Sequence, residues 1–110
     1  LIDNNTAIVL MTHHYSRDLQ FLIKLKESFS VYIGLLGATN RRERLLNEFI
    51  ERNPDAEDIF LDKIYGPTGL NIGAITPQEI ALSICAEILS VVRKMEPKPL
   101  KKRTEAIYLQ

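Results

Sequence analysis

Two short runs of consecutive apolar residues constrain the fold more than any other feature of this sequence. Residues 7–11 (AIVLM) and residues 32–38 (YIGLLGA) are each followed directly by polar residues. An apolar run of this length, bounded by turn signals, is typical of a strand covered on both faces of a parallel sheet. Between the two runs, Leu19, Leu22 and Ile23 share one face of a helical pattern. Strand, helix and strand in this order predict a right-handed crossover between parallel strands.

The second run ends in a glycine turn, and a polar helix begins directly after it. Gly34 and Gly37 allow the backbone to turn sharply and to approach a neighbour or a ligand closely. We expect Asn40, with Glu43 three residues later, to cap this helix, as Ser16 caps the preceding one. A helix that begins at the end of a strand offers free N–H groups to a phosphate or other anion. The alternative is a strand–turn–helix corner in which the small residues serve packing alone.

The next part of the chain predicts a short helix, a third strand and a shaped loop. Asn53-Pro54 should end the polar helix, because the residue before a proline avoids the helical region. Residues 55–61 indicate a short helix and residues 63–65 a short strand. Residues 66–75 contain three glycines and a proline, which predicts a loop of defined shape. Thr76, Pro77 and Glu79 then form the clearest capping box of the sequence.

The helix that follows Thr76 and runs to residue 94 is apolar on nearly all sides. Its apolar residues are Ile80, Leu82, Ile84, Cys85, Ile88, Leu89, Val91 and Val92. Such a helix is buried on more than one side, so we expect it to pack against the sheet and against the second copy in a homodimer. Cys85 has aliphatic neighbours, which predicts a core thiol and not a nucleophile. A single cysteine suits a reducing compartment, and we expect a cytoplasmic protein.

Composition argues against several classes of function. The 110 residues include 14 basic and 14 acidic residues, so no net charge favours nucleic acid or an anionic membrane. No apolar run approaches the roughly 20 residues of a membrane span, and no signal peptide is visible. The sequence contains no nucleophile-elbow serine and no phosphate-loop lysine, so nothing in it amounts to a catalytic apparatus. We therefore expect a binding protein.

Polar side chains follow each of the two apolar runs. His13 and His14 follow the first run, at the end of a strand where open α/β sheets bind ligands. Adjacent side chains of an extended chain point to opposite faces, so we expect no metal site here. One histidine, together with Thr12, faces a ligand or packs within the loop. Three arginines follow the second run and either grip a phosphate or form a solvated helix face (Arg41, Arg42 and Arg44).

These elements predict an α/β fold, a three-layer, Rossmann-like parallel sheet of three strands with helices on both faces. A complete doubly wound domain has about six strands, and its phosphate-binding glycines follow the first of them. No such motif follows a strand here, and the chain begins at Leu1. We expect residues 1–96 to form the second half of such a domain. Residues 97–110 form a basic tail, in which residues 106–109 dock as a last strand or remain free.

Three blocks of the sequence, in this order, resemble the C-terminal Rossmann domain of the XdhC/CoxI family. They are VLMTHH at residues 9–14, YIGLLG at residues 32–37, and PTGLNIGAITPQEIALSICAEI at residues 67–88. The resemblance runs from about residue 7 to residue 92, which is most of the chain.

The resemblance implies an accessory protein for molybdenum hydroxylases such as xanthine dehydrogenase and carbon monoxide dehydrogenase. Members of the family bind molybdenum cofactor (molybdopterin), protect it during sulfuration and help to deliver it to the apo-enzyme. The family's cofactor-holding cysteine belongs to an N-terminal domain and does not match Cys85. We expect cofactor contacts at seven small or edge residues: Thr12, His13, Gly34, Gly37, Ala38, Gly69 and Gly73.

Two other classes of function remain open. An NAD(P)-binding oxidoreductase domain would need a first-strand glycine fingerprint and a proton donor, neither of which is visible in this sequence. A dimerisation module would use the apolar C-terminal helix as its contact surface.

Overall fold

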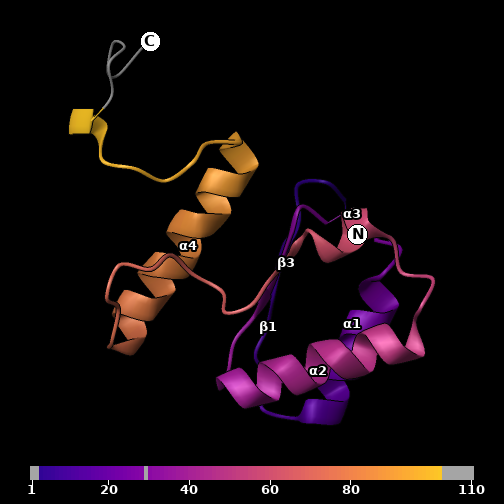
Figure 1. Cartoon of the computed structure of the whole chain (residues 1–110). Coiled ribbons are helices and arrows are strands. Elements are labelled where there is room, and N and C mark those ends of the chain that lie inside the picture. Colours follow the sequence, from indigo (N-terminus) through magenta and orange to yellow (C-terminus); the bar gives the residue numbers. More distant parts are fainter. Residues whose placement is uncertain (1–2, 29, 103–110) are drawn as a thin grey trace.

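The chain folds around a three-stranded parallel sheet with helices on both faces (Figure 1). This computed structural model describes residues 3–28 and 30–102. Strands β1 (Ala7–Leu10), β2 (Tyr32–Leu35) and β3 (Ile64–Tyr65) lie in the order β1-β2-β3. The α/β class and the parallel crossover predicted from the sequence are confirmed, although each strand is shorter than predicted. The last strand predicted at residues 106–109 lies outside the described residues.

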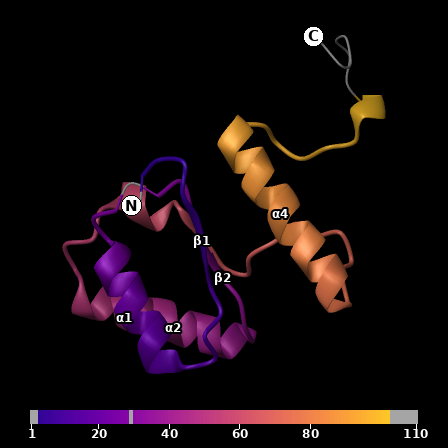
Figure 2. The same ribbon diagram turned by 180° about the vertical axis from the view of Figure 1, so that it is seen from behind.

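The helices separate into two layers, as the views from front and back agree (Figures 1 and 2). Helices α1 (Tyr15–Leu25) and α2 (Thr39–Arg52) lie together on one face of the sheet. Helix α3 (Asp58–Leu61) is a single turn before β3, and α4 (Pro77–Arg93) lies on the opposite side. A 3₁₀ turn, η1 (Leu100–Lys102), follows. Within the described ranges, no helix combines the length and apolar character needed to cross a membrane.

The hydrophobic core lies between the sheet and the pair α1 and α2. Ile33 and Leu35 contribute from β2, and Leu45 and Phe49 of α2 are the residues of that helix that are fully enclosed. Ile50, the residue after Phe49, is 42% exposed. The remaining core residues are Leu10, Leu19, Leu22, Leu25 and Phe60. Helix α2 ends at Arg52, before the Asn53-Pro54 pair, as predicted.

Helix α4 covers the opposite face of the sheet. Only one side of this helix packs against the sheet, and its other side is exposed. The ring of Tyr32 is fully buried on this face of the sheet and stacks on Tyr65, with ring centres 4.6 Å apart. Ser83 is the buried residue of α4, whereas Leu82 is 64% exposed. The sequence-based expectation of a core position for Cys85 is wrong, because nothing in residues 3–28 and 30–102 covers the outer side of α4 and the thiol is exposed.

The caps predicted for α1 and α2 are also wrong. Each helix begins two residues earlier than predicted, so that Ser16 and Asn40 lie inside the first turn. The cap positions fall to His14 and Ala38, whose side chains make no capping hydrogen bond. The turns after β1 and β2 are tighter than the sequence suggested, and they leave the first amides of both helices without a side-chain acceptor.

The capping box at the start of α4 is confirmed. The Thr76 hydroxyl accepts a hydrogen bond from the Glu79 amide at 3.2 Å, and the Glu79 carboxylate accepts from the Thr76 amide at 3.0 Å. The carboxylate also accepts from the Ile75 amide at 2.9 Å. These bonds from backbone amides lower the pKa of Glu79 below its ordinary value.

We expect Thr76→Ala to lower the free energy of unfolding by about 1 kcal/mol, because the Glu79 amide loses its acceptor. Thr76→Ser is the matched control, since it retains the hydroxyl and should remain close to the unaltered chain. Urea denaturation followed by circular dichroism measures both variants. Equal losses in the two variants would show that the hydroxyl is not the stabilising group.

Candidate functional site

The three strands are parallel and adjacent, so their carboxyl ends meet at one edge of the sheet. Six of the seven residues predicted from the sequence lie in the segments that leave this edge. Thr12 and His13 follow β1, Gly37 and Ala38 follow β2, and Gly69 and Gly73 lie in the loop after β3. Gly34 is different, because it lies within β2 and is buried. The fold thus brings together segments that are far apart in the sequence.

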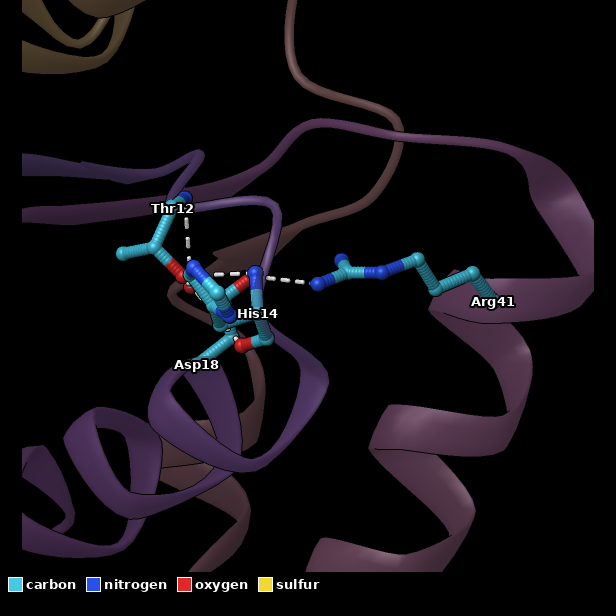
Figure 3. Close-up of polar contacts among 4 residues, drawn as sticks. All are labelled: Thr12, His14, Asp18 and Arg41. Carbon is cyan, nitrogen blue, oxygen red and sulfur yellow. Dashed lines mark hydrogen bonds and ion pairs between the residues drawn. The ribbon is translucent and has the colours of Figure 1, made fainter.

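A buried carboxylate joins the start of α1 to the start of α2 (Figure 3). Asp18 has no exposed side-chain surface, and its Oδ1 accepts a hydrogen bond from the Thr12 hydroxyl at 2.8 Å. Its Oδ2 pairs with Nη2 of Arg41 on α2 at 3.0 Å. The Arg41 side chain is 27% exposed, so the guanidinium reaches the surface beside this pair. The first turns of α1 and α2 are therefore held side by side by a charge pair.

The turn after β1 has an uncommon backbone conformation. His13 has a φ of 64°, in the left-handed region, where a non-glycine residue costs on the order of 1–3 kcal/mol. The Thr12 hydroxyl accepts a hydrogen bond from the His14 amide at 3.1 Å and donates to Asp18, which holds this conformation. Both imidazoles are exposed. Thr12 is thus a residue that shapes the turn, whereas the two histidines are available at the edge.

Two further arginines make defined contacts at the start of α2. Arg42 donates from Nε to the Gly37 carbonyl at 2.9 Å and from Nη2 to the Thr39 hydroxyl at 3.0 Å. The Arg44 guanidinium lies 4.3 Å from the centre of the Tyr15 ring. No acidic residue lies in the first turn of α2. Arg41 and Arg42 are therefore held by contacts within the protein, whereas Arg44 is exposed and lies over Tyr15.

A hollow of about 380 Å³ lies at the same edge, beneath the glycine loop. Residues 67–74 form most of its lining, and Leu36, Ile80 and Ser83 complete it. Of the residues predicted from the sequence, Gly69 and Gly73 therefore line a hollow. Gly34 faces protein instead, because a Cβ there would lie 2.5 Å from Oγ1 of Thr68. The edge thus has two parts, the starts of α1 and α2, joined by the Asp18–Arg41 pair, and a hollow under the glycine loop.

A hydrogen-bond network that sequence analysis missed holds the glycine loop in place. The Tyr32 hydroxyl donates to Oε1 of Glu87 at 2.7 Å, and the Gly69 amide donates to the same oxygen at 2.9 Å. Tyr32 also bonds to the Thr68 hydroxyl, which must be the donor because the phenol has one hydrogen. Burial raises the pKa of Tyr32 above its ordinary value of 10.0. The hydrogen bond from Thr68 lowers this pKa, whereas the contact with Glu87 raises it further.

The sequence contained a signal for this network. Glu87 is the single charged residue between positions 80 and 92, in an otherwise apolar helix. A lone charge on a buried helix face needs a partner. Tyr32 is the residue of the second apolar run whose side chain carries a polar group, its hydroxyl. Nothing local in the sequence, however, pairs two residues that are 55 positions apart.

The family model described as the XdhC Rossmann domain matches residues 2–88. The chain belongs to the XdhC family. This confirms the resemblance seen in the three sequence blocks, and the residues of the carboxyl edge all lie within the matched range.

Relatives and a solved structure agree with this assignment. The chain is 39% identical over 89 residues to a probable xanthine dehydrogenase subunit of Bacillus subtilis (strain 168), covering 81% of this chain and 24% of that protein. It is 31% identical over 90 residues to the molybdenum cofactor insertion chaperone PaoD of Escherichia coli (strain K12), covering 82% and 28%. A crystal structure of a xanthine dehydrogenase from Bacillus halodurans shares the fold, with a TM-score of 0.67 and 34% identity over 94% of this chain and 27% of that one. This XdhC Rossmann chain therefore spans only about a quarter of the length of these proteins.

We expect Asp18→Ala to destabilise the chain by about 1–3 kcal/mol, because the Thr12 hydroxyl and the Arg41 guanidinium lose the buried carboxylate that accepts their hydrogen bonds. Asp55→Ala is the matched control. Asp55 is 75% exposed and lies 3.5 Å from Lys26, so its removal should change stability by about 0.5 kcal/mol or less. Urea denaturation measures both. Similar small losses in the two variants would contradict a structural role for the Asp18–Arg41 pair.

We expect the stability of the chain to fall as the pH rises above about 10, partly through Tyr32. The phenol of the unfolded chain ionises at its ordinary pKa, whereas the folded state holds the proton because the pKa of Tyr32 is raised. The stabilisation is complete below the unfolded pKa and is lost as the pH rises toward the folded one. Tyr32→Phe should reduce this slope, and Tyr65→Phe, which retains the network, should not. Denaturation midpoints at a series of alkaline pH values measure the difference.

Proposed function

We propose that this XdhC Rossmann domain binds the molybdenum cofactor, or a related nucleotide, and assists its sulfuration and its insertion into a xanthine dehydrogenase-type enzyme. Family membership supports this proposal most strongly, together with a relative that is named a molybdenum cofactor insertion chaperone. The domain acts as a non-catalytic accessory protein, and its partner is the apo-enzyme of a molybdenum hydroxylase. The edge that combines two uncapped helix starts with a hollow is consistent with this function.

The phosphate groups of the ligand bind at the starts of α1 and α2. Neither helix has a side-chain cap, so the first amides of both helices are free to donate hydrogen bonds to an anion. Arg41 uses one nitrogen for Asp18, which leaves further donors of its guanidinium for a phosphate. His13, Gly37 and Ala38 are exposed around these amides. The residues at this edge thus fit the phosphate end of the cofactor.

The nucleotide and pterin parts extend toward the hollow under the glycine loop, where Gly69 and Gly73 line the wall. In the described ranges this edge contains no thiol, since Cys85 lies on α4 and does not line the hollow. We therefore expect the domain to hold the cofactor by its organic part.

We further propose that residues 1–96 are the second half of a doubly wound domain, as expected from the sequence. Among the described strands, β1 pairs on one side only, with β2. Parallel sheets of this kind are covered on both faces and bind ligands where the strand order reverses. Further strands added at β1 would place that reversal beside Thr12 and His13. Their helices would cover the outer side of α4, where Leu82, Leu89 and Val92 are exposed.

A second copy of the chain is the alternative cover for α4. The exposed apolar residues of that helix favour such a homodimer, and a dimerisation role would use this surface. The two arrangements differ in a measurable way, because a dimer of this chain buries α4 without any additional polypeptide.

We expect Ala38→Asp to weaken the binding of cytidine diphosphate by about tenfold, because the carboxylate repels the phosphates at the start of α2. Ala38 occupies the cap position, where aspartate is favourable, so the same variant should be more stable by about 1 kcal/mol. Isothermal titration of the full chain of 110 residues measures the affinity.

Ala38→Ser is the matched control for this experiment. Serine also caps the helix but adds no charge, so it should stabilise the chain similarly and weaken binding less. Unchanged affinity in Ala38→Asp would show that the start of α2 does not bind the phosphates.

A further inference from the structure

Glu87 joins three segments that are separate in the sequence. It lies on α4, and its Oε1 accepts hydrogen bonds from the Tyr32 hydroxyl of β2 and from the Gly69 amide of the glycine loop. The two distances are 2.7 and 2.9 Å, and both donors converge on one oxygen atom. The carboxylate thus connects sheet, loop and helix at a single point.

The glycine loop is packed as closely as its backbone allows at this point. Gly69 has a φ of 111°, and a Cβ there would lie 2.5 Å from Oγ of Ser83. The Leu70 amide donates to the Ser83 carbonyl at 3.2 Å, and the Thr68 amide donates to the Leu35 carbonyl at 3.1 Å. The glycine loop, which follows β3 in the chain, is therefore fixed by direct contacts with β2 and with α4.

The remainder of the loop depends on this anchor. Residues 71–75, all of which the structure describes, make few hydrogen bonds. Apart from the capping box, the one bond found there runs from the Ile72 amide to the Leu70 carbonyl, at 3.0 Å. Asn71 and Gly73 are exposed, and a Cβ at Gly73 would meet nothing within 4 Å. Residues 71–74 form part of the wall of the hollow. Their position thus depends on Gly69 and Leu70, which are hydrogen-bonded to α4.

We infer that Glu87 is a positioning residue: it holds the glycine loop so that the hollow at the carboxyl edge accepts the nucleotide part of a ligand. This inference rests on the proposed function, because the ligand is the nucleotide proposed there. Glu87 acts through the loop and through Tyr32, and it is not among the residues that line the hollow.

Two conservative substitutions separate the reach of this side chain from its charge. Glu87→Gln retains the length of the side chain and one oxygen that can accept both bonds. Glu87→Asp retains the charge but withdraws the oxygen by one methylene, which leaves the Gly69 amide without its acceptor and the Tyr32 hydroxyl with Thr68 as its one remaining partner in this network. Arg93→Gln, an exposed change near the end of α4, is the control for altered helix charge.

The experiment measures hydrogen exchange at the Gly69 amide without ligand, and the affinity of each variant for cytidine diphosphate. We expect Glu87→Asp to lower the protection of this amide, and the affinity, by about tenfold each. Glu87→Gln should remain within about threefold of the unaltered chain in both measurements. Arg93→Gln should give the same values as the unaltered chain. Circular dichroism verifies that each variant is folded.

The opposite order of effects, with Glu87→Gln impaired and Glu87→Asp normal, would show that charge and not position matters, and would overturn the inference. Unchanged Gly69 protection in Glu87→Asp would also overturn it, while nucleotide binding by the unaltered chain would leave the proposed function standing. Failure of the unaltered chain to bind the nucleotide would instead count against the proposed function itself. Because hydrogen exchange is measured without ligand, the two failures are distinguishable.

Discussion

The burial of β2 on both of its faces is the constraint on which the rest of this structure depends. All four residues of the strand are buried, and each face imposes a different requirement. Ile33 and Leu35 contribute to the core against α1 and α2. On the other face, the buried Tyr32 brings a hydroxyl group that must find hydrogen-bond partners, because an unsatisfied buried polar group is costly. Thr68 and Glu87 supply them, and the glycine loop and α4 are thereby attached to the sheet.

Two carboxylates organise the carboxyl edge from its two sides. Asp18 binds donors from the turn after β1 and from α2, and Glu87 binds donors from β2 and from the glycine loop. Each therefore links segments that the chain itself does not hold together. A buried ion pair such as Asp18–Arg41 adds little net stability compared with apolar packing, but it defines one arrangement of its neighbours. The two carboxylates thus give the edge a defined shape.

The sequence predicted those features that depend on local patterns. The apolar runs located β1 and β2, and the Thr76 capping box located the start of α4, because a hydroxyl and a carboxylate three residues apart form their bonds locally. The caps of α1 and α2 were placed incorrectly because a helix start also depends on how tightly the preceding turn folds. The exposure of Cys85 depends on what lies beside α4, which no pattern within the helix specifies. The Tyr32–Glu87 contact joins distant residues, and so it required the fold to be known first. The family resemblance indicated the edge that holds the candidate site, but the structure separates Gly34, which packs against Thr68, from the residues that reach the surface.

The exposed thiol on α4 has a practical use. The chain contains one cysteine, so a fluorescent or spin-labelled maleimide would attach at Cys85 alone and on the outer side of that helix. The emission or mobility of such a reporter would change when another polypeptide comes to lie against α4. The same position that sequence reasoning assigned to the interior thus provides a direct spectroscopic readout of assembly.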